Sequence, residues 1–195
     1  MQLAYAPIRV MEPAIIERLR LAFPVMDFTI ERVPQVMTIK EFERHANQAP
    51  FIGLAWTGLK PDSASGRILK GQMLWRLILI FKASSGLETR FKGDARGIGL
   101  DAMVDVAVAL LQGAVFPGIG LCTVTLANSI IADGWSDDQI VIAQVDFAIA
   151  FSITPAAFEL VTLDDFKTLG VTWAISTDPN ADTVNNEIAI PTGAP

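Results

Sequence analysis

Two carboxylates at helical spacing are the first residues in this sequence that could perform chemistry. Asp101 and Asp105 are four residues apart in the stretch Gly93–Gly113, and on a helical wheel they share one narrow stripe with Gln112. Such a pair can bind a cation or share a proton as an acid–base pair. More often it is a solvated stripe that keeps the helix oriented, since the mutual repulsion costs only about 0.2–0.5 kcal/mol. We therefore expect a solvated stripe.

The single histidine, His45, lies at the end of a short predicted helix. Cations suit helix C-termini, so we expect a solvated histidine or one that caps this helix. Any Ser–His–Asp or Cys–His site would have to use His45, and nothing around it resembles a nucleophile motif. The sequence gives no catalytic residue, no cofactor-binding residue and no metal ligand, and we expect a protein that is not an enzyme.

Other polar groups fit known motifs no better. Three aspartates surround Trp135 without the fixed spacing or the closing Glu of a calcium loop, namely Asp133, Asp137 and Asp138. Four glycines form neither a dinucleotide nor a P-loop pattern, namely Gly97, Gly99, Gly118 and Gly120. We expect the aspartates to be solvated in a loop, and Gly118 and Gly120 to permit a turn.

A small basic group surrounds one predicted loop and consists of Lys82, Arg90, Lys92 and Arg96. These side chains could contact an acidic neighbouring subunit or passing DNA phosphates. We favour the simpler interpretation, a solvated edge. The net charge of −6 argues against a protein that grips nucleic acid with a broad basic face.

The composition is unusually apolar for a soluble chain. Of the 195 residues, 51% are hydrophobic and 18% are charged, against about 25% charged in typical soluble domains. The longest apolar runs, Leu77–Phe81 and Val106–Leu111, are far shorter than the roughly 20 residues of a membrane-spanning helix, and the N-terminus lacks a secretory signal. We expect a soluble intracellular protein that buries apolar surface against other subunits.

The one cysteine, Cys122, excludes a disulfide within the chain and a multi-cysteine metal site. It lies in a stretch of alternating apolar residues. We therefore expect a buried small hydrophobic side chain.

The central element is the helix expected from about Leu100 to Leu111. One flank of its wheel carries Leu100, Val104, Ala107 and Leu111, while Met103, Val106 and Leu110 lie opposite the aspartate stripe. This apolar surface is too wide for a helix that packs on one sheet alone. We expect the first flank to face a sheet, against Leu77, Leu79, Phe147 and Ile149, and another helix or subunit to cover the rest.

The remaining elements follow from capping signals and alternation. Helices are expected over 13–23 and 38–46, and strands over 51–57, 72–82, 121–127, 139–153 and 171–175. The first residues of the second helix, Thr38 and Glu41, fit a capping box. The segments 58–71 and 84–92 have the composition of loops. We expect one domain over 1–176 and a polar tail or arm over 177–195.

The strand expected over 139–153 is unusually long, since at about 3.3 Å per residue it would span roughly 50 Å. It either bends or projects as half of a ribbon. A long apolar edge must be covered, and the simplest cover is the next subunit of a ring. Ile188–Ile190 could add a short strand to a neighbouring edge.

Several stretches, in this order of elements, resemble the tail terminator proteins of Mu-like tailed bacteriophages. They are IIERLRLAFP at Ile15–Pro24, LWRLILIFKA at Leu74–Ala83, GLDAMVDVAVALL at Gly99–Leu111 and DDFKTLGVTWAI at Asp164–Ile175. None is a catalytic signature. The resemblance implies an α+β fold: a mainly antiparallel sheet with a long central helix and one or two shorter helices packed on it.

The resemblance also implies a function. In that family the subunits form a hexameric ring, which caps the tail tube at the head-proximal end of the virion and ends its polymerisation. The ring joins the tail to the head or neck and is assembled in the host bacterial cytoplasm. Its partners would be its own copies, the tail tube protein, a neck or head-completion protein, and DNA passing through the lumen without specific binding. No membrane and no cofactor are implied. Two alternatives remain: another phage neck or tail adaptor, and a small-ligand-binding protein.

Overall fold

The computed structural model describes residues 2–3, 6–63, 66, 68–83, 86–95, 97–130, 139–153, 160–161, 168–173 and 184–189. The chain divides into two compact units: Tyr5–Ala157, and a smaller unit formed by Met1–Ala4 with Phe158–Pro195. The sequence placed its division later, between residues 176 and 177. The predicted loop aspartates Asp133, Asp137 and Asp138 lie outside the described residues.

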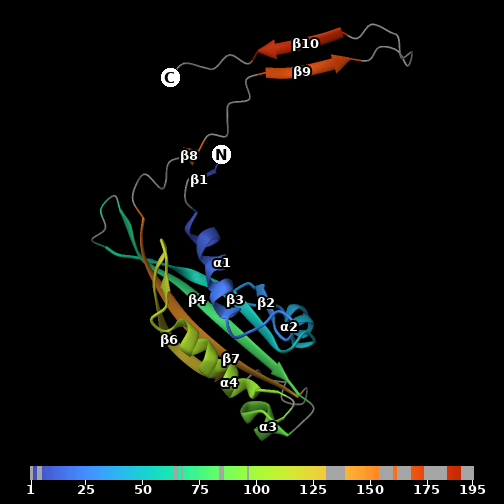
Figure 1. The fold of residues 1–195 in the computed structure, drawn as a ribbon, viewed down its shortest axis with the longest axis vertical. Coiled ribbons are helices and arrows are strands. Elements are labelled where there is room, and N and C mark those ends of the chain that lie inside the picture. The colour runs from blue at the N-terminus through green and yellow to red at the C-terminus, as the bar shows by residue number, and fades with distance from the viewer. Residues whose placement is uncertain are drawn as a thin grey trace. The chain divides into compact units, whose positions relative to one another are not determined.

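The larger unit contains the central helix and the main sheet. Its elements in chain order are α1 (Pro7–Leu19), β2 (Thr29–Arg32), α2 (Ile39–Ala46), β3 (Phe51–Pro61), β4 (Leu69–Lys82), α3 (Leu87–Lys92), α4 (Gly99–Leu111), β5 (Val115–Phe116), β6 (Gly120–Ile130) and β7 (Ile140–Ile153). The six strands form one sheet in the order β2-β3-β4-β7-β6-β5 (Figure 1). Every neighbouring pair is antiparallel except β2 with β3. The predicted α+β class is confirmed.

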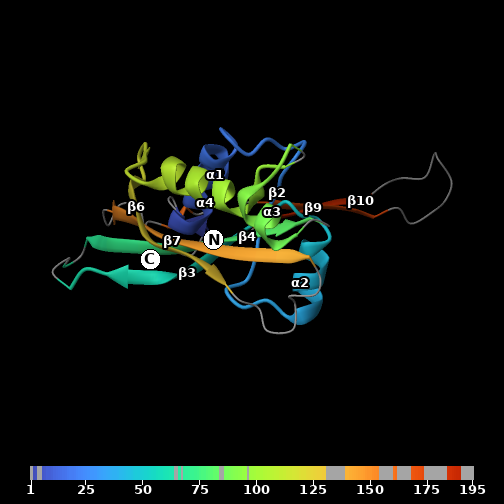
Figure 2. The same ribbon diagram turned by 90° about the horizontal axis from the view of Figure 1, so that it is seen from below.

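The helices lie on both faces of this sheet. α1, α3 and α4 cover one face, and α2 lies on the other face near one end of the strands (Figure 2). We call these the three-helix face and the α2 face. Alternate residues of each strand point to opposite faces, so β4 and β7 supply apolar side chains to both.

The three-helix face holds the core beneath α4. Besides Gly99, four residues of α4 are buried at the spacing of one helical face, namely Leu100, Met103, Ala107 and Leu111. The strand residues predicted to lie under them are buried as well: Leu77, Leu79, Phe147 and Ile149. The sequence placed Val104 in this set, but Val104 is only half-buried and Met103 takes its place.

α4 has the second layer of cover that its wide apolar surface predicted. α1 and α3 both contact it within the same chain. Arg18 in the last turn of α1 donates from Nε to the backbone oxygen of Leu110, at 2.9 Å. This bond satisfies one of the carbonyls that the C-terminal turn of a helix leaves without a partner.

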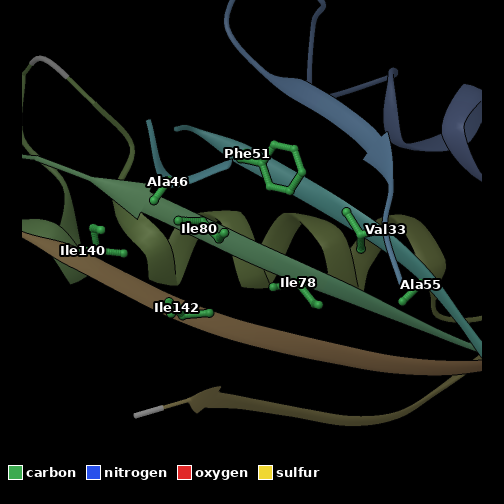
Figure 3. Close-up of a cluster of buried hydrophobic side chains, with 8 residues drawn as sticks. All are labelled: Val33, Ala46, Phe51, Ala55, Ile78, Ile80, Ile140 and Ile142. Atoms are coloured by element: carbon green, nitrogen blue, oxygen red, sulfur yellow. The ribbon is translucent and has the colours of Figure 1, made fainter. Parts of the chain in front are cut away.

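The α2 face has a smaller core of its own. It consists of Val33, Ala46, Phe51, Ala55, Ile78, Ile80, Ile140 and Ile142 (Figure 3). The predicted capping box starts α2. Thr38 Oγ1 accepts from the backbone N–H of Glu41 at 3.3 Å, and Glu41 Oε2 accepts from the backbone N–H of Thr38 at 2.9 Å. The hydrogen bond from Thr38 lowers the pKa of Glu41.

Three boundaries differ from the sequence expectations. The first helix begins at Pro7, where a missing N–H costs nothing, and Pro13 is inside it. The predicted loop 58–71 is mostly strand, because β3 and β4 pair from Phe51↔Ile80 to Pro61↔Gly71 around a bulge at Trp56/Gly58. The predicted loop 84–92 contains α3.

The long predicted strand is β7, with 14 residues, and it is not an edge. Its whole length pairs with β4, which also has 14 residues, and β6 pairs along its other side. Both strands curve along their length (Figure 1). The expectation of a long exposed apolar edge on β7 or β4 is therefore wrong.

The described residues of the smaller unit form two short antiparallel pairs. β1 (Gln2–Leu3) pairs with β8 (Leu160–Val161), and β9 (Thr168–Trp173) pairs with β10 (Val184–Ala189). Part of the predicted polar tail thus forms a strand with its own chain, where we had expected a neighbour's edge. Ile190 lies outside the described residues.

Candidate interaction surfaces

The aspartate stripe lies on the solvent side of α4, as predicted. Asp101 and Asp105 are both exposed, and neither makes an ion pair within the described part of the chain. Gln112, the third member of the stripe, is structural: its Oε1 accepts from the backbone N–H of Val124 at 2.9 Å and ties the end of α4 to β6.

His45 is buried, so the expectation of a solvated histidine is wrong. Only 2% of its surface is exposed, and its ring stacks on Phe51 with centroids 4.2 Å apart. Arg44 Nη2 lies 3.2 Å from Nε2, and Gln48 Oε1 lies 3.4 Å from Nδ1. Because a guanidinium only donates, Nε2 accepts and Nδ1 carries the proton. His45 occupies the last turn of α2, as predicted, and packs there as a core residue.

Two described members of the predicted basic group make separate contacts with other side chains. Lys82 Nζ donates to Asn47 Oδ1 at 3.2 Å, and Lys92 pairs within α3 with Glu88 at 2.7 Å. Arg90 is half-buried in α3, and Arg96 lies outside the described residues. These contacts fit the solvated edge that the sequence favoured.

The cysteine and the glycines serve the fold. Cys122 is fully buried, as predicted, and burial raises the pKa of its thiol to about 12. Gly99 has a φ of +73°, and a side chain there would collide with the backbone of Gly93 and Phe91. Gly120 follows the predicted turn, and a side chain there would collide with the carbonyl of Ala150.

The structure shows one surface that sequence reasoning missed. The α2 face continues beyond the small core, and no described helix covers it there (Figure 2). We call this area the open face. Its members alternate along four strands: Gly58 and Lys60 on β3; Lys70, Gln72, Leu74 and Arg76 on β4; Gln144, Asp146, Ala148 and Ala150 on β7; and Leu121, Thr123, Leu126 and Asn128 on β6.

An ion pair neutralises the centre of the open face. Arg76 and Asp146 stand opposite each other in the β4–β7 register, with Nε–Oδ1 at 2.6 Å and Nη2–Oδ2 at 2.9 Å. Their side chains are 28% and 21% exposed, and the hydrogen bond to Asp146 raises the pKa of Arg76. A bidentate pair of this kind fixes both side chains in one geometry.

The rest of the open face is uncharged except at one end. Leu121 and Leu126 are 48% and 46% exposed, and Thr123, Asn128 and Ala150 are exposed as well. The charged end is the β3–β4 hairpin, where Lys60, Asp62 and Lys70 are exposed and line a groove of about 550 Å³. Neither lysine makes an ion pair among the residues that the structure describes.

A second cavity, of about 750 Å³, lies elsewhere in the larger unit. Its lining includes the apolar side chains Phe28, Pro50, Phe81 and Ile98. Asp27, Lys82 and Asp94 supply polar groups. Neither Asp101 nor Asp105 contributes to it, so this cavity does not serve the aspartate stripe.

Within the described ranges, no three His, Cys, Asp or Glu side chains gather as a metal-binding group. None of the described helices is long and apolar enough to cross a membrane.

Comparison with known proteins gives similarities to solved structures but none to a family model or a curated protein. No protein-family model matches the sequence, and no curated protein matches it. Among solved structures, the chain is similar to one from the virion of a native gene transfer agent (GTA) particle, with a TM-score of 0.49 and 14% identity. The match covers 76% of this chain and 98% of that chain.

Proposed function

We propose that this chain is a structural protein of a tailed-phage virion, and specifically a tail terminator. Six copies form a ring that caps the finished tail tube, ends its polymerisation and joins it to the head or neck. Two findings support this. Four stretches of the sequence resemble Mu-like tail terminators, and the α+β fold with its central helix is the fold that this resemblance implies.

The open face is the observation that carries the proposal. It presents exposed leucines, small residues and neutral polar groups on the face of the sheet that α2 covers only near one end. Extended surfaces with exposed apolar side chains mark interaction sites in soluble proteins. A ring subunit needs two different contact surfaces, because heterologous contacts are the ones that close into rings.

The charge of the chain fits a channel through which DNA slides. Binding to phosphates would require many lysine or arginine contacts, and the net charge here is −6. In the proposed ring DNA passes through the lumen without specific contacts, the tail tube and a neck or head-completion protein bind the two ends, and no step of catalysis is involved.

Native mass spectrometry and electron microscopy of the purified protein test this function. We expect a sixfold ring by microscopy and a mass of six chains. In purified tails, antibody labelling should mark the head-proximal end. A stable monomer at micromolar concentration, with no ring on isolated tails, would contradict the proposal. A ring at another position of the virion would favour a neck or tail adaptor instead.

The 750 Å³ cavity favours a second candidate, a small-ligand-binding protein. Cavities of this size with apolar walls and a few polar groups are typical ligand sites. A monomer whose melting temperature rises with a small apolar ligand, and whose response is lost in Phe81→Ala, would favour this candidate.

A further inference from the structure

We propose that the open face of one subunit docks on α4 of the next, so that Lys60 and Lys70 pair with Asp101 and Asp105. This inference rests on the ring proposed above and assigns the two surfaces that hold it together. The occupant of the open face is thus a second copy of this chain.

The two surfaces lie on opposite sides of the same sheet. α4 packs on the three-helix face, with Asp101 and Asp105 on its solvent side, and the open face is the other side of β3, β4, β7 and β6 (Figure 2). A contact between them joins different patches on the two copies. Such a contact leaves the pair of copies with one free surface of each kind, so further copies can add, and the assembly closes into a ring when the rotation between neighbouring copies permits it.

The two exposed lysines of the open face and the two exposed aspartates of α4 are opposite in sign and equal in number. Besides its own ion pair, the open face carries Lys60 and Lys70 at one end, and Asp62 lines the groove at that end. Asp101 and Asp105 are two exposed carboxylates for which the described part of the chain provides no ion-pair partner. Contact between copies pairs the two lysines with the two aspartates.

The distance between the two lysines is also close to the distance between the two aspartates. In the strand register Lys60 stands opposite Gln72, and Lys70 is two residues before Gln72 on the same face. The two lysines are therefore about 8 Å apart at their backbones. The aspartates, one helical turn apart, are about 5–6 Å apart. The long lysine side chains span the difference.

The neutral parts of the surfaces suit a helix lying close to a sheet. Beside the lysines the open face carries Gly58, Ala148 and Ala150, which leave little side-chain volume above the strands. On α4 the neighbours of the aspartate stripe include Ala109, which is exposed, and Val108, which is half-buried. The Arg76–Asp146 pair keeps the centre of the docked surface free of unpaired charge, which would otherwise be costly to cover.

Charge reversal on each surface tests the inference, with native mass spectrometry as the readout. In Lys60→Glu/Lys70→Glu both surfaces are negative, and in Asp101→Lys/Asp105→Lys both are positive. We expect each variant to be monomeric by itself. Mixed in equal amounts, they should form an alternating ring with three copies of each, which their mass difference identifies. The chain that carries all four changes should again form a ring by itself.

A matched control changes two lysines away from both surfaces. Lys40 lies on α2 and Lys82 at the end of β4, and both are exposed. Lys40→Glu/Lys82→Glu alters the net charge by the same amount and should leave the ring intact. Circular dichroism melting confirms that every variant is folded.

If a charge-reversal variant does not fold, the double variant Lys60→Gln/Lys70→Gln, which removes the two positive charges, takes its place. Added salt should weaken the wild-type ring, and it should weaken the ring of the neutral variant less. A wild-type ring whose stability is unchanged by the reversals, or folded variants that do not assemble when mixed, would overturn this assignment while leaving the ring function in place. A wild-type chain that forms no ring would refute the proposed function itself.

Discussion

Leu111 has no exposed surface and closes the core at the C-terminal end of α4. Its truncation to Ala removes buried methyl groups and leaves a cavity, so we expect Leu111→Ala to lower the free energy of unfolding by about 2–5 kcal/mol. The matched control is Asp101→Asn, which changes an exposed residue of the same helix and should fall within about 0.5 kcal/mol. Urea denaturation measures both. Equal small losses would mean that Leu111 does not lie in the core.

Cys122 gives a second prediction at the scale of one residue. Burial raises the pKa of its thiol from 9.0 to about 12, so the native protein should not react with a thiol reagent at pH 8. Unfolding in guanidinium should release one reactive thiol. Because the unfolded thiol ionises at lower pH than the folded one, Cys122 should lower the stability as pH rises from about 9 toward 12. Rapid labelling of the native protein would contradict this.

The contacts of a single residue could be predicted from the sequence where they involve residues close by in the chain. The capping box of Thr38 and Glu41 depends on residues three apart, and it forms as expected. The burial of His45 depends on Phe51, which α2 meets only after folding. The Arg76–Asp146 pair depends on the β4–β7 register, which joins residues 70 positions apart. No local pattern reveals contacts of that kind.

At the scale of one element, the N-terminus of α2 provides a prediction. Thr38→Ala removes the acceptor for the backbone N–H of Glu41, so we expect a loss of about 0.5–2 kcal/mol in the free energy of unfolding. Its control, Thr38→Ser, keeps the acceptor and should cost less. Since the pKa of Glu41 is lowered on folding from 4.5, the contribution of Glu41 is present above that pH and is lost as the pH falls below it. Denaturation of Glu41→Gln and wild type at pH 7 and pH 3 should show their difference shrinking in acid.

Whole helices and strands could be predicted where the apolar residues repeat with the period of one type of secondary structure. The alternation along β7 and the apolar flank of α4 both gave elements in nearly the right place. The β3–β4 hairpin was missed because Gly58, Pro61 and Gly71 are typical of loops. Pairing in the sheet overrides that local preference, with a bulge at Gly58 that absorbs the irregularity. The open face was missed for the same reason, since part of it lies on this hairpin.

At the scale of the whole molecule, the division into two units predicts the effect of a truncation. Deleting residues 177–195 removes β10 and leaves the larger unit, Tyr5–Ala157, with all its strands and helices. We expect circular dichroism and the urea midpoint of that unit to change little. Assembly or attachment to the tail should weaken, because β9 loses its partner strand. Native mass spectrometry measures the number of chains in the assembly. If the truncated chain assembles as the full chain does, residues 177–195 have no role in assembly.

The pairing of β4 with β7 has a mechanical consequence. The two strands are hydrogen-bonded along all 14 residues of each, and the bonds run perpendicular to the strands. A pull along the strand direction therefore loads the whole row of bonds at once in shear, whereas a pull across the strands opens them one after another. In single-molecule stretching, one force is applied between the N-terminal end of β4 and the N-terminal end of β7, which lie at opposite ends of the antiparallel pair. The larger unit should resist this force far better than a force applied across the sheet. A subunit of this kind would hold tension along one axis and give way along the other.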